Sequence, residues 1–267
     1  RLMRVAGPWV RQVGQRFGSL AEFFARSEPL EQQHEYVVAW LDCMPREGGA
    51  TRGVLFAGDH DPSPAPVRER HARAMPVAPP FSLVNNLTLR AFNALYFRAH
   101  GREGETKAVP WDRFFYPLDG LRGWNRMYGP RGFFQYQCVV PEGDSGRAAL
   151  EALLARIAAS GQGSFLGVLK RFGTHPPAGM LSFPRPGYTL ALDFPNRGEA
   201  TALLLDALDL IVLEAGGRVY AAKDARMSAR SFRAFYPGWQ AFARFVDPRF
   251  SSSFWRRVTA GATEAQP

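Results

Sequence analysis

Two glutamines and a lysine are polar side chains whose positions within apolar segments suggest a binding site. Gln135 and Gln137 lie two residues apart in an expected strand, so they share one sheet face, which needs water or a polar ligand. Lys170 ends an apolar run, where burial of its ammonium would require an anion such as a substrate phosphate. The alternatives are that both glutamines face solvent and that Lys170 extends from a strand end into water.

Sequence-local motifs for nucleotide, acyl or zinc chemistry are absent, since the sequence contains no GxGxxG after a strand, no GxxxxGK[ST], no GxSxG and no HExxH. Residues 131–137 begin like the basic-Gly-aromatic motif of an RNA-binding sheet but depart from it at the fourth and fifth positions. Residues 59–61 (Asp-His-Asp) point apart on an extended segment and have no second ligand cluster. We therefore expect no metal site and no nucleic-acid partner.

Composition bounds the class of protein. The chain has 267 residues, 46% hydrophobic and 21% charged, which suits one large or two modest globular domains. Cys43 and Cys138 cannot form a disulfide framework, which favours a reducing compartment. No run reaches the roughly 18 to 20 apolar residues of a membrane-spanning helix. The first residue is Arg1 and no signal peptide follows, so we expect the chain to begin inside a longer one.

The positive charge is concentrated near the C-terminus. The formal net charge is +9, and residues 219–257 carry eight basic and two acidic side chains. Such a surface could meet nucleic acid, anionic lipid, a phosphorylated substrate or an acidic partner domain. The alternative is a solvated basic face.

Hydrophobic periodicity predicts an α+β fold. Ser19 to Glu22 form a capping box that starts a short helix through Phe24. Six prolines in residues 61–80 predict a long loop, and residues 83–98 form an amphipathic helix. Strands are expected at 36–41, 53–57, 133–140, 164–171 and 188–194, and further helices at 150–157 and 201–215. Because strands and helices do not alternate one to one, we expect a mainly antiparallel sheet flanked by helices.

Five strings remain unexplained by these elements. They are FYPLD (115–119), FFQYQ (133–137), SFLGVLKRFG (164–173), LSFP (181–184) and GRVYAAKDARM (217–227). In this order and spacing they resemble the decaprenylphosphoryl-β-D-ribose oxidase family, flavoproteins of the vanillyl-alcohol oxidase superfamily that also includes the aldonolactone oxidases. The resemblance extends from about Leu20 to Arg257.

The resemblance implies an FAD enzyme whose N-terminal flavin-binding domain lies upstream of this chain. Residues 1–218 would form the substrate-binding (cap) domain, and residues 219–267 would be a helical segment that returns to pack on the flavin domain. This arrangement would account for the missing glycine-rich motif and would give the basic C-terminal segment a partner.

The resemblance also implies a reaction, in which flavin accepts a hydride from a sugar carbon while a base removes the hydroxyl proton. The substrate would be a pentose on a polyprenyl phosphate. By position, the resemblance implies that the substrate pocket is lined by Lys170 and Phe172, by the polar groups of Gln137 and Tyr116, and by Thr189 and Ala191. It also implies that Tyr220 and Lys223 lie beside the isoalloxazine. Lys223 would have a catalytic role as a fixed cation that stabilises the anionic reduced flavin.

Two positions depart from the family pattern, because Thr189 and Ala191 stand where the mycobacterial enzymes have Asn and Cys. The sugar or lipid could therefore differ. An aldonolactone oxidase is one alternative function, and a non-catalytic module that binds anionic lipid or nucleic acid is another. The expected location is cytoplasmic and peripheral at the membrane, with the periplasmic face left open, and a reductase or epimerase is an expected partner. We expect the chain alone to bind no flavin and to be inactive.

Overall fold

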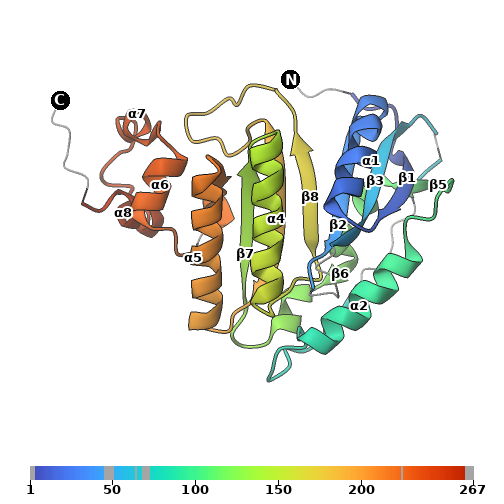
Figure 1. Cartoon of the computed structure of the whole chain (residues 1–267), viewed down its shortest axis with the longest axis horizontal. Coiled ribbons are helices and arrows are strands. Elements are labelled where there is room, and N and C mark those ends of the chain that lie inside the picture. The colour runs from blue at the N-terminus through green and yellow to red at the C-terminus, as the bar shows by residue number, and fades with distance from the viewer. Residues whose placement is uncertain (1–3, 45–50, 64, 68–72, 224, 262–267) are drawn as a thin grey trace.

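The structure, a computed structural model, describes residues 4–44, 51–63, 65–67, 73–223 and 225–261. Its centre is an eight-stranded sheet in the order β10-β7-β9-β8-β2-β3-β1-β5, in which all neighbouring strands are antiparallel (Figure 1). The strands are β1 (Trp9–Phe17), β2 (Tyr36–Asp42), β3 (Arg52–Asp61), β5 (Thr106–Pro110), β7 (Phe133–Val140), β8 (Gly167–Phe172), β9 (Gly187–Pro195) and β10 (Arg218–Val219). The prediction of an α+β fold with a mainly antiparallel sheet is confirmed.

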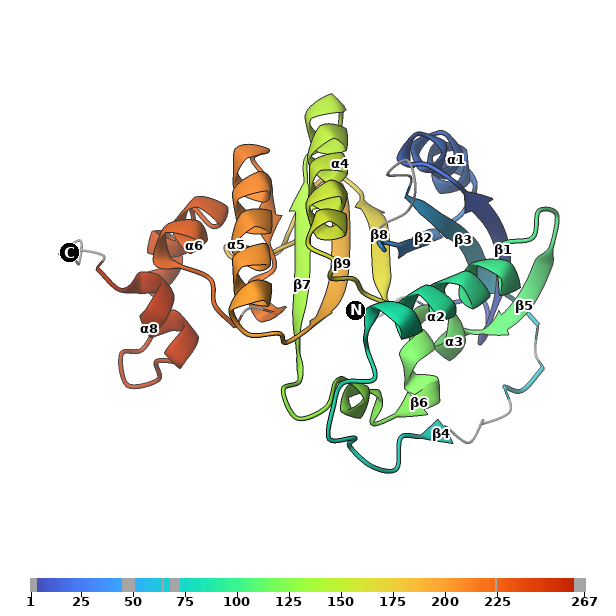
Figure 2. The ribbon, with the colours of Figure 1, turned by 60° about the horizontal axis from the view of Figure 1, so that its bottom comes forward.

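Helices cover both faces of the sheet. Helices α1, α4 and α5 lie on one face, and α2 and α3 lie on the other side of the half formed by β2, β3, β1 and β5 (Figure 2). The bounds are α1 (Leu20–Gln33), α2 (Asn86–Ala99), α3 (Trp111–Phe115), α4 (Asp144–Ala159), α5 (Glu199–Glu214), α6 (Ala229–Phe235), α7 (Trp239–Ala243) and α8 (Ser253–Thr259). Short 3-10 helices are η2 (Pro117–Gly120), η3 (Trp124–Tyr128) and η4 (Ala221–Lys223). In the other half of the sheet, formed by β10, β7, β9 and β8, the face opposite α4 and α5 carries the polar side chains described below.

The alternation of β7 sets the two faces of the sheet, as predicted. Tyr136, Cys138 and Val140 are buried in the core that the sheet shares with α4 and α5. Gln135 and Gln137 therefore lie on the opposite face, since successive strand side chains point to opposite sides. Burial of one face fixes the register of this strand.

The N-terminal region holds more regular structure than expected. Strand β1 pairs with both β3 and β5, and neither β1 nor β5 was predicted. The Ser19 hydroxyl caps α1 by accepting the Glu22 amide at 3.1 Å, which confirms the helix start. The carboxylate of Glu22, however, accepts the amide of Gly18 rather than that of Ser19. The helix also continues past Phe24 to Gln33, because Leu30 is buried in the core.

The Pro-rich segment 61–80 contains little regular structure where it is described. After Asp61, where β3 ends, the element described in this segment is β4 (Arg73–Ala74), which pairs in parallel with β6 (Leu121–Arg122). Residues 64 and 68–72 of this segment, and residues 45–50 of the expected hairpin connection, lie outside the described residues.

The amphipathic helix predicted after this segment is α2, but its apolar stripe faces outward. Leu87 and Leu95 are exposed, and Leu89 and Asn93 are the buried positions. Periodicity located the helix correctly but did not reveal which side packs on the protein.

The C-terminal helices pack on the same core as the sheet. Phe232, Phe235 and Val258 are buried together with residues of α5, and β10 pairs with β7. Residues on both sides of position 218 thus share one core, and the division into segments 1–218 and 219–267 stays a prediction. No helix in the described part of the chain is long and apolar enough to cross a membrane.

Candidate functional site

A polar row crosses three neighbouring strands on the sheet face opposite α4 and α5. The side-chain amide of Gln137 on β7 donates to the hydroxyl of Thr189 on β9, with an Nε2 to Oγ1 distance of 3.0 Å. Lys170 on β8 is the register partner of Thr189 on its other side. The row therefore places an amide, a hydroxyl and an ammonium side by side. Thr189 is only 2% exposed, so the accessible members are Gln137 and Lys170, which suit a ligand with hydroxyl and anionic groups. Ala191, the register partner of Gln137, lies on the same face.

Lys223 lies at the β7 end of this face. It ends η4, and the preceding Tyr220 is tied to the strand by its amide, which donates to the Gln137 carbonyl at 2.8 Å. Burial lowers the pKa of Lys223, and the nearby carboxyl of Asp193 opposes that shift. Burial also lowers the pKa of Lys170, and repulsion from Lys223 adds to it. The two cations thus lie within electrostatic reach of each other.

Asp193 is a site residue to which sequence reasoning assigned no role. It is 3% exposed on β9, and the Gln135 side chain donates to its Oδ1 at 3.2 Å. Its Oδ2 and the hydroxyl of Tyr128 are buried without a hydrogen-bond partner among the described residues. Burial raises the pKa of Asp193 to about 6, against the lowering effects of Gln135 and Lys223. The available signal was the alternation Thr189, Ala191, Asp193, which predicts a polar side chain on the site face.

Aromatic rings connect the two ends of the site. The ring of Phe183 stacks on that of Tyr220 with centroids 4.6 Å apart and meets the ring of Phe172 edge-on at 5.9 Å. Phe172 and Tyr220 are far apart in sequence, and the buried Phe183 brings them into one cluster.

A large cleft adjoins Lys170. Its volume is about 1260 Å³, and it lies over β2 and β8 between α2 and α3. Aromatic and charged side chains line it, among them Tyr36, Trp40, Tyr96, Tyr116, Lys170 and Arg171. The exposed Tyr116 lies in this cleft with Lys170, whereas Gln137, Tyr220 and Lys223 line a separate hollow of about 20 Å³. The expected site residues therefore lie on one side of the sheet but not in one cavity, and Phe172, Thr189 and Ala191 line neither of the two.

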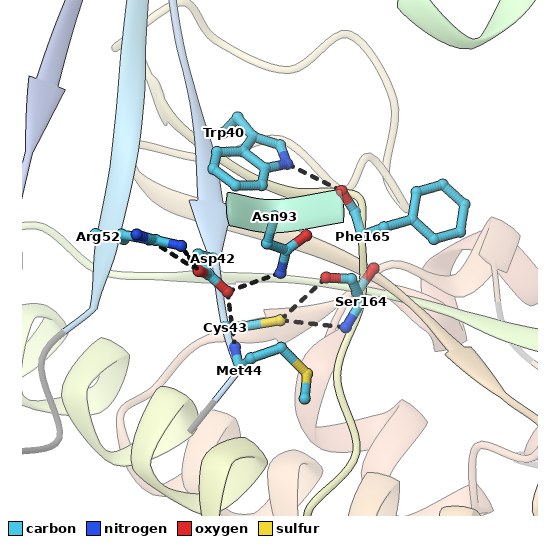
Figure 3. Close-up of polar contacts among 8 residues, drawn as sticks. All are labelled: Trp40, Asp42, Cys43, Met44, Arg52, Asn93, Ser164 and Phe165. Atoms are coloured by element: carbon cyan, nitrogen blue, oxygen red, sulfur yellow. Dashed lines mark hydrogen bonds and ion pairs between the residues drawn. The ribbon is translucent and has the colours of Figure 1, made fainter. Parts of the chain in front are cut away.

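A buried polar network supports the cleft wall (Figure 3). The carboxylate of Asp42 at the end of β2 accepts the side-chain amide of Asn93 at 2.7 Å and pairs with Arg52 at 2.9 Å. The indole of Trp40 donates to the Phe165 carbonyl at 2.9 Å. These contacts hold α2 and the segment before β8 against β2, and so fix the width of the cleft.

Comparison with known proteins adds to this geometry. Over 257 residues, the chain is 37% identical to decaprenylphosphoryl-β-D-ribose oxidase of Mycolicibacterium smegmatis, an alignment that covers 90% of this chain. The chain is thus similar, over most of its own length, to a decaprenylphosphoryl-β-D-ribose oxidase. The resemblance inferred from the five strings is thereby confirmed.

The chain spans about half of the length of this M. smegmatis relative, 55%. The chain is also 32% identical over 262 residues to an uncharacterized protein in the mprA 5' region of Streptomyces coelicolor. This alignment covers 91% of the present chain and 71% of the S. coelicolor protein. No family model matches.

Solved structures give weaker likenesses. The 6-hydroxy-D-nicotine oxidase of Arthrobacter nicotinovorans is 12% identical with a TM-score of 0.48, covering 91% of this chain and 53% of that one. Physcomitrella patens BBE-like 1 is 12% identical with a TM-score of 0.45, covering 92% and 53%. Because both TM-scores are below 0.5, the similarity to decaprenylphosphoryl-β-D-ribose oxidase rests on the sequence comparison.

Proposed function

We propose that the protein is an FAD-dependent oxidoreductase that oxidises a secondary alcohol of a sugar, and that its substrate is a pentose carried on a polyprenyl phosphate. In this proposal the present chain supplies the substrate-binding portion, and an upstream portion of the same protein supplies most of the flavin site. Similarity to the M. smegmatis oxidase supports the class of reaction. The observation that carries the proposal is the row of Gln137, Thr189 and Lys170 beside the cleft.

The residues at the β7 end fit one wall of a flavin site. Tyr220 and Lys223 line the small hollow beside Gln137, so an aromatic ring and a cation are available there for a flat, partly anionic group. The hollow of about 20 Å³ cannot enclose such a group, so the other walls would belong to the rest of the protein. FAD, when bound, would accept the hydride released from the alcohol carbon.

The chain's own side chains would bind and orient the sugar. Gln137 and Thr189 would hold sugar hydroxyls, and their mutual hydrogen bond limits the freedom of both groups before the substrate arrives. Lys170 would pair with the phosphate at the cleft, where Tyr116 would pack against the sugar or the first lipid carbons. Phe172, beside the cleft in the aromatic cluster with Phe183, would extend this contact. Lys223 would place a positive charge where negative charge develops during the reaction.

The remaining parts of the proposal concern location and partners. We propose a peripheral enzyme at the membrane, because a polyprenyl phosphate stays in the bilayer. The two free cysteines favour the cytoplasmic side, with the periplasmic face as the alternative. A reductase or epimerase would use the ketone that alcohol oxidation produces.

An anaerobic absorbance titration of the full-length gene product tests the proposal. We expect a polyprenylphosphoryl pentose to bleach the flavin bands stoichiometrically, and the free pentose or an aldonolactone to do so only at far higher concentration. Bleaching by the lactone at least as readily would identify an aldonolactone oxidase instead. A colourless full-length protein would refute the oxidase proposal altogether.

A further inference from the structure

Helix α2 exposes an apolar stripe to solvent. Leu87 is 78% exposed and Leu95 is 66% exposed, and the exposed Ala91 lies between them at helical spacing. Large apolar side chains gathered on one exposed helix face are typical of an interaction surface.

Buried polar contacts fix the orientation of this stripe. Asn93, on the opposite side of α2, donates to the carboxylate of Asp42 at 2.7 Å (Figure 3). The ring of Tyr96 packs against the ring of Trp40 with centroids 4.5 Å apart. Turning the leucines inward would break the first contact and leave the buried Asp42 carboxylate without this donor.

The same face carries positive charge only. Arg90 and Arg98 lie on the stripe, both exposed, and neither pairs with an acidic side chain among the residues the structure describes. The sequence contains no Asp or Glu between Glu69 and Glu103, whereas five arginines occur there: Arg70, Arg73, Arg90, Arg98 and Arg102. An anionic partner is therefore complementary to this face.

Helix α5 offers an internal contrast. Leu203 and Leu210 are 59% and 58% exposed, so this helix also presents two large apolar side chains to solvent. Asp206 lies between them at helical spacing, and Glu214 follows one turn later. The acidic neighbours make α5 a poor match for an anionic partner and a suitable control.

We propose that the outward face of α2, formed by Leu87, Arg90, Ala91, Leu95 and Arg98, docks on an anionic lipid bilayer. The helix would lie in the plane of the interface, with the leucines among the upper acyl carbons and the arginines at the lipid phosphates. A 14-residue helix is too short to span the bilayer but long enough for this arrangement.

The placement of α2 favours lipid over a flavin-binding portion of the same protein. Helix α2 contacts β2 through Asp42 and Trp40, whereas Tyr220 and Lys223 lie beside β7, with β9 and β8 between these two strands. Tyr96 and His100 line the cleft from the inner side of α2, so docking would bring the cleft close to the bilayer. This docking face deepens the membrane location proposed above and rests on it. Docking is measured without turnover, so it can fail while the proposed reaction stands.

Vesicle co-sedimentation of the full-length protein tests the proposal, with phosphatidylcholine vesicles that contain or lack phosphatidylglycerol. We expect salt-sensitive binding to the anionic vesicles. Arg90→Gln with Arg98→Gln should weaken it about 25-fold, at about 1 kcal/mol per arginine near the surface. Leu87→Gln with Leu95→Gln should weaken it at least about tenfold through lost apolar burial. The matched pair Leu203→Gln with Leu210→Gln on α5 should bind like the unmodified protein.

Three results would overturn the proposal. The first is wild-type affinity in both α2 double variants, and the second is a wild-type protein that binds no anionic vesicles. The third is a change in oligomeric state, in flavin retention or in thermal midpoint that occurs in the α2 leucine variant but not in the α5 control. Such a change would show that another protein surface, not lipid, covers the outward face of α2.

Discussion

Thr189 accepts a hydrogen bond from Gln137 at 3.0 Å and lies in register with Lys170 on the next strand. Its hydroxyl is thus the middle of a polar row that crosses β7, β9 and β8. Since Thr189 is only 2% exposed, its hydroxyl acts within the row by fixing the position of the Gln137 amide.

Replacement of this hydroxyl should have a small cost in stability and a larger one in binding. We expect Thr189→Val to lower the free energy of unfolding by about 1 kcal/mol, because the Gln137 amide loses its acceptor. Urea denaturation measures this change. Thr106→Val on the exposed end of β5 is the control and should change the stability by less than about 0.5 kcal/mol. Equal effects of the two variants would contradict the role of the Thr189 contact.

Asp193 should make the stability depend on pH. Burial raises its pKa to about 6 in the folded state, so the folded protein binds this proton more tightly than the unfolded chain does. Burial of this carboxyl therefore lowers the free energy of unfolding very little below about pH 4. The loss grows to about 3 kcal/mol as the pH rises past 6, at about 1.4 kcal/mol per pKa unit. We expect Asp193→Asn to become progressively more stable than the wild type between pH 4 and pH 7. If the difference in unfolding free energy between Asp193→Asn and the wild type were the same at every pH in this range, the pKa of Asp193 would not be raised by folding.

Lys170 should affect substrate binding more than turnover. Loss of a charge-assisted hydrogen bond to phosphate costs about 1.5 to 3 kcal/mol, so Lys170→Gln should raise KM for a phosphorylated lipid-linked sugar about 10- to 100-fold, with a smaller change in kcat. Lys107→Gln is the control within the same cleft, because Lys107 is already paired with Glu105 at 2.8 Å, and it should change KM much less than Lys170→Gln does. Steady-state kinetics with phosphorylated and unphosphorylated substrates measure this change. An equal rise of KM for both substrates in Lys170→Gln would show that Lys170 supports the structure and does not bind the phosphate.

The buried Asp42 should depend on its arginine partner. Arg52→Met would leave this carboxylate with its amide donors but without its cation, and we expect about 3 kcal/mol of destabilisation. Arg26→Met removes a more exposed pair with Glu103, and its effect should stay within about 1 kcal/mol. Thermal or urea unfolding of the two variants compares a buried pair with an exposed one directly.

The two cysteines of this chain should be unreactive in the folded protein. Burial raises the pKa of the Cys43 thiol to about 11 and that of Cys138 to about 12. Iodoacetamide at pH 8 should therefore leave both unmodified until the protein unfolds, as peptide mass spectrometry would show. Ala191→Cys, on the half-buried site face, should gain one modified thiol. Alkylation of Cys43 in the native protein would indicate that the core opens locally.

Sequence reasoning located the elements with strong periodicity and missed those without it. Strand β7 was predicted residue for residue because Tyr136 and Cys138 alternate cleanly with two glutamines. Strand β1 was missed because its polar residues are spread over both faces of a half-buried strand. The outward direction of Leu87 could not be predicted, since periodicity defines a stripe but not the side that packs. Asp193 was not assigned a role because its importance depends on Gln135 and Tyr128, which only the tertiary structure brings near it.

The sheet order divides the chain into two contiguous halves. Strands β2, β3, β1 and β5 come from residues 9–110, and β10, β7, β9 and β8 come from residues 133–219. Among the described residues, the ladder that joins these halves consists of three pairs, from Ala39 with Leu169 to Leu41 with Gly167. We therefore expect each half to assemble its own four strands as it leaves the ribosome, and the union of β2 with β8, which completes the core shared by both halves, to be the last step of folding.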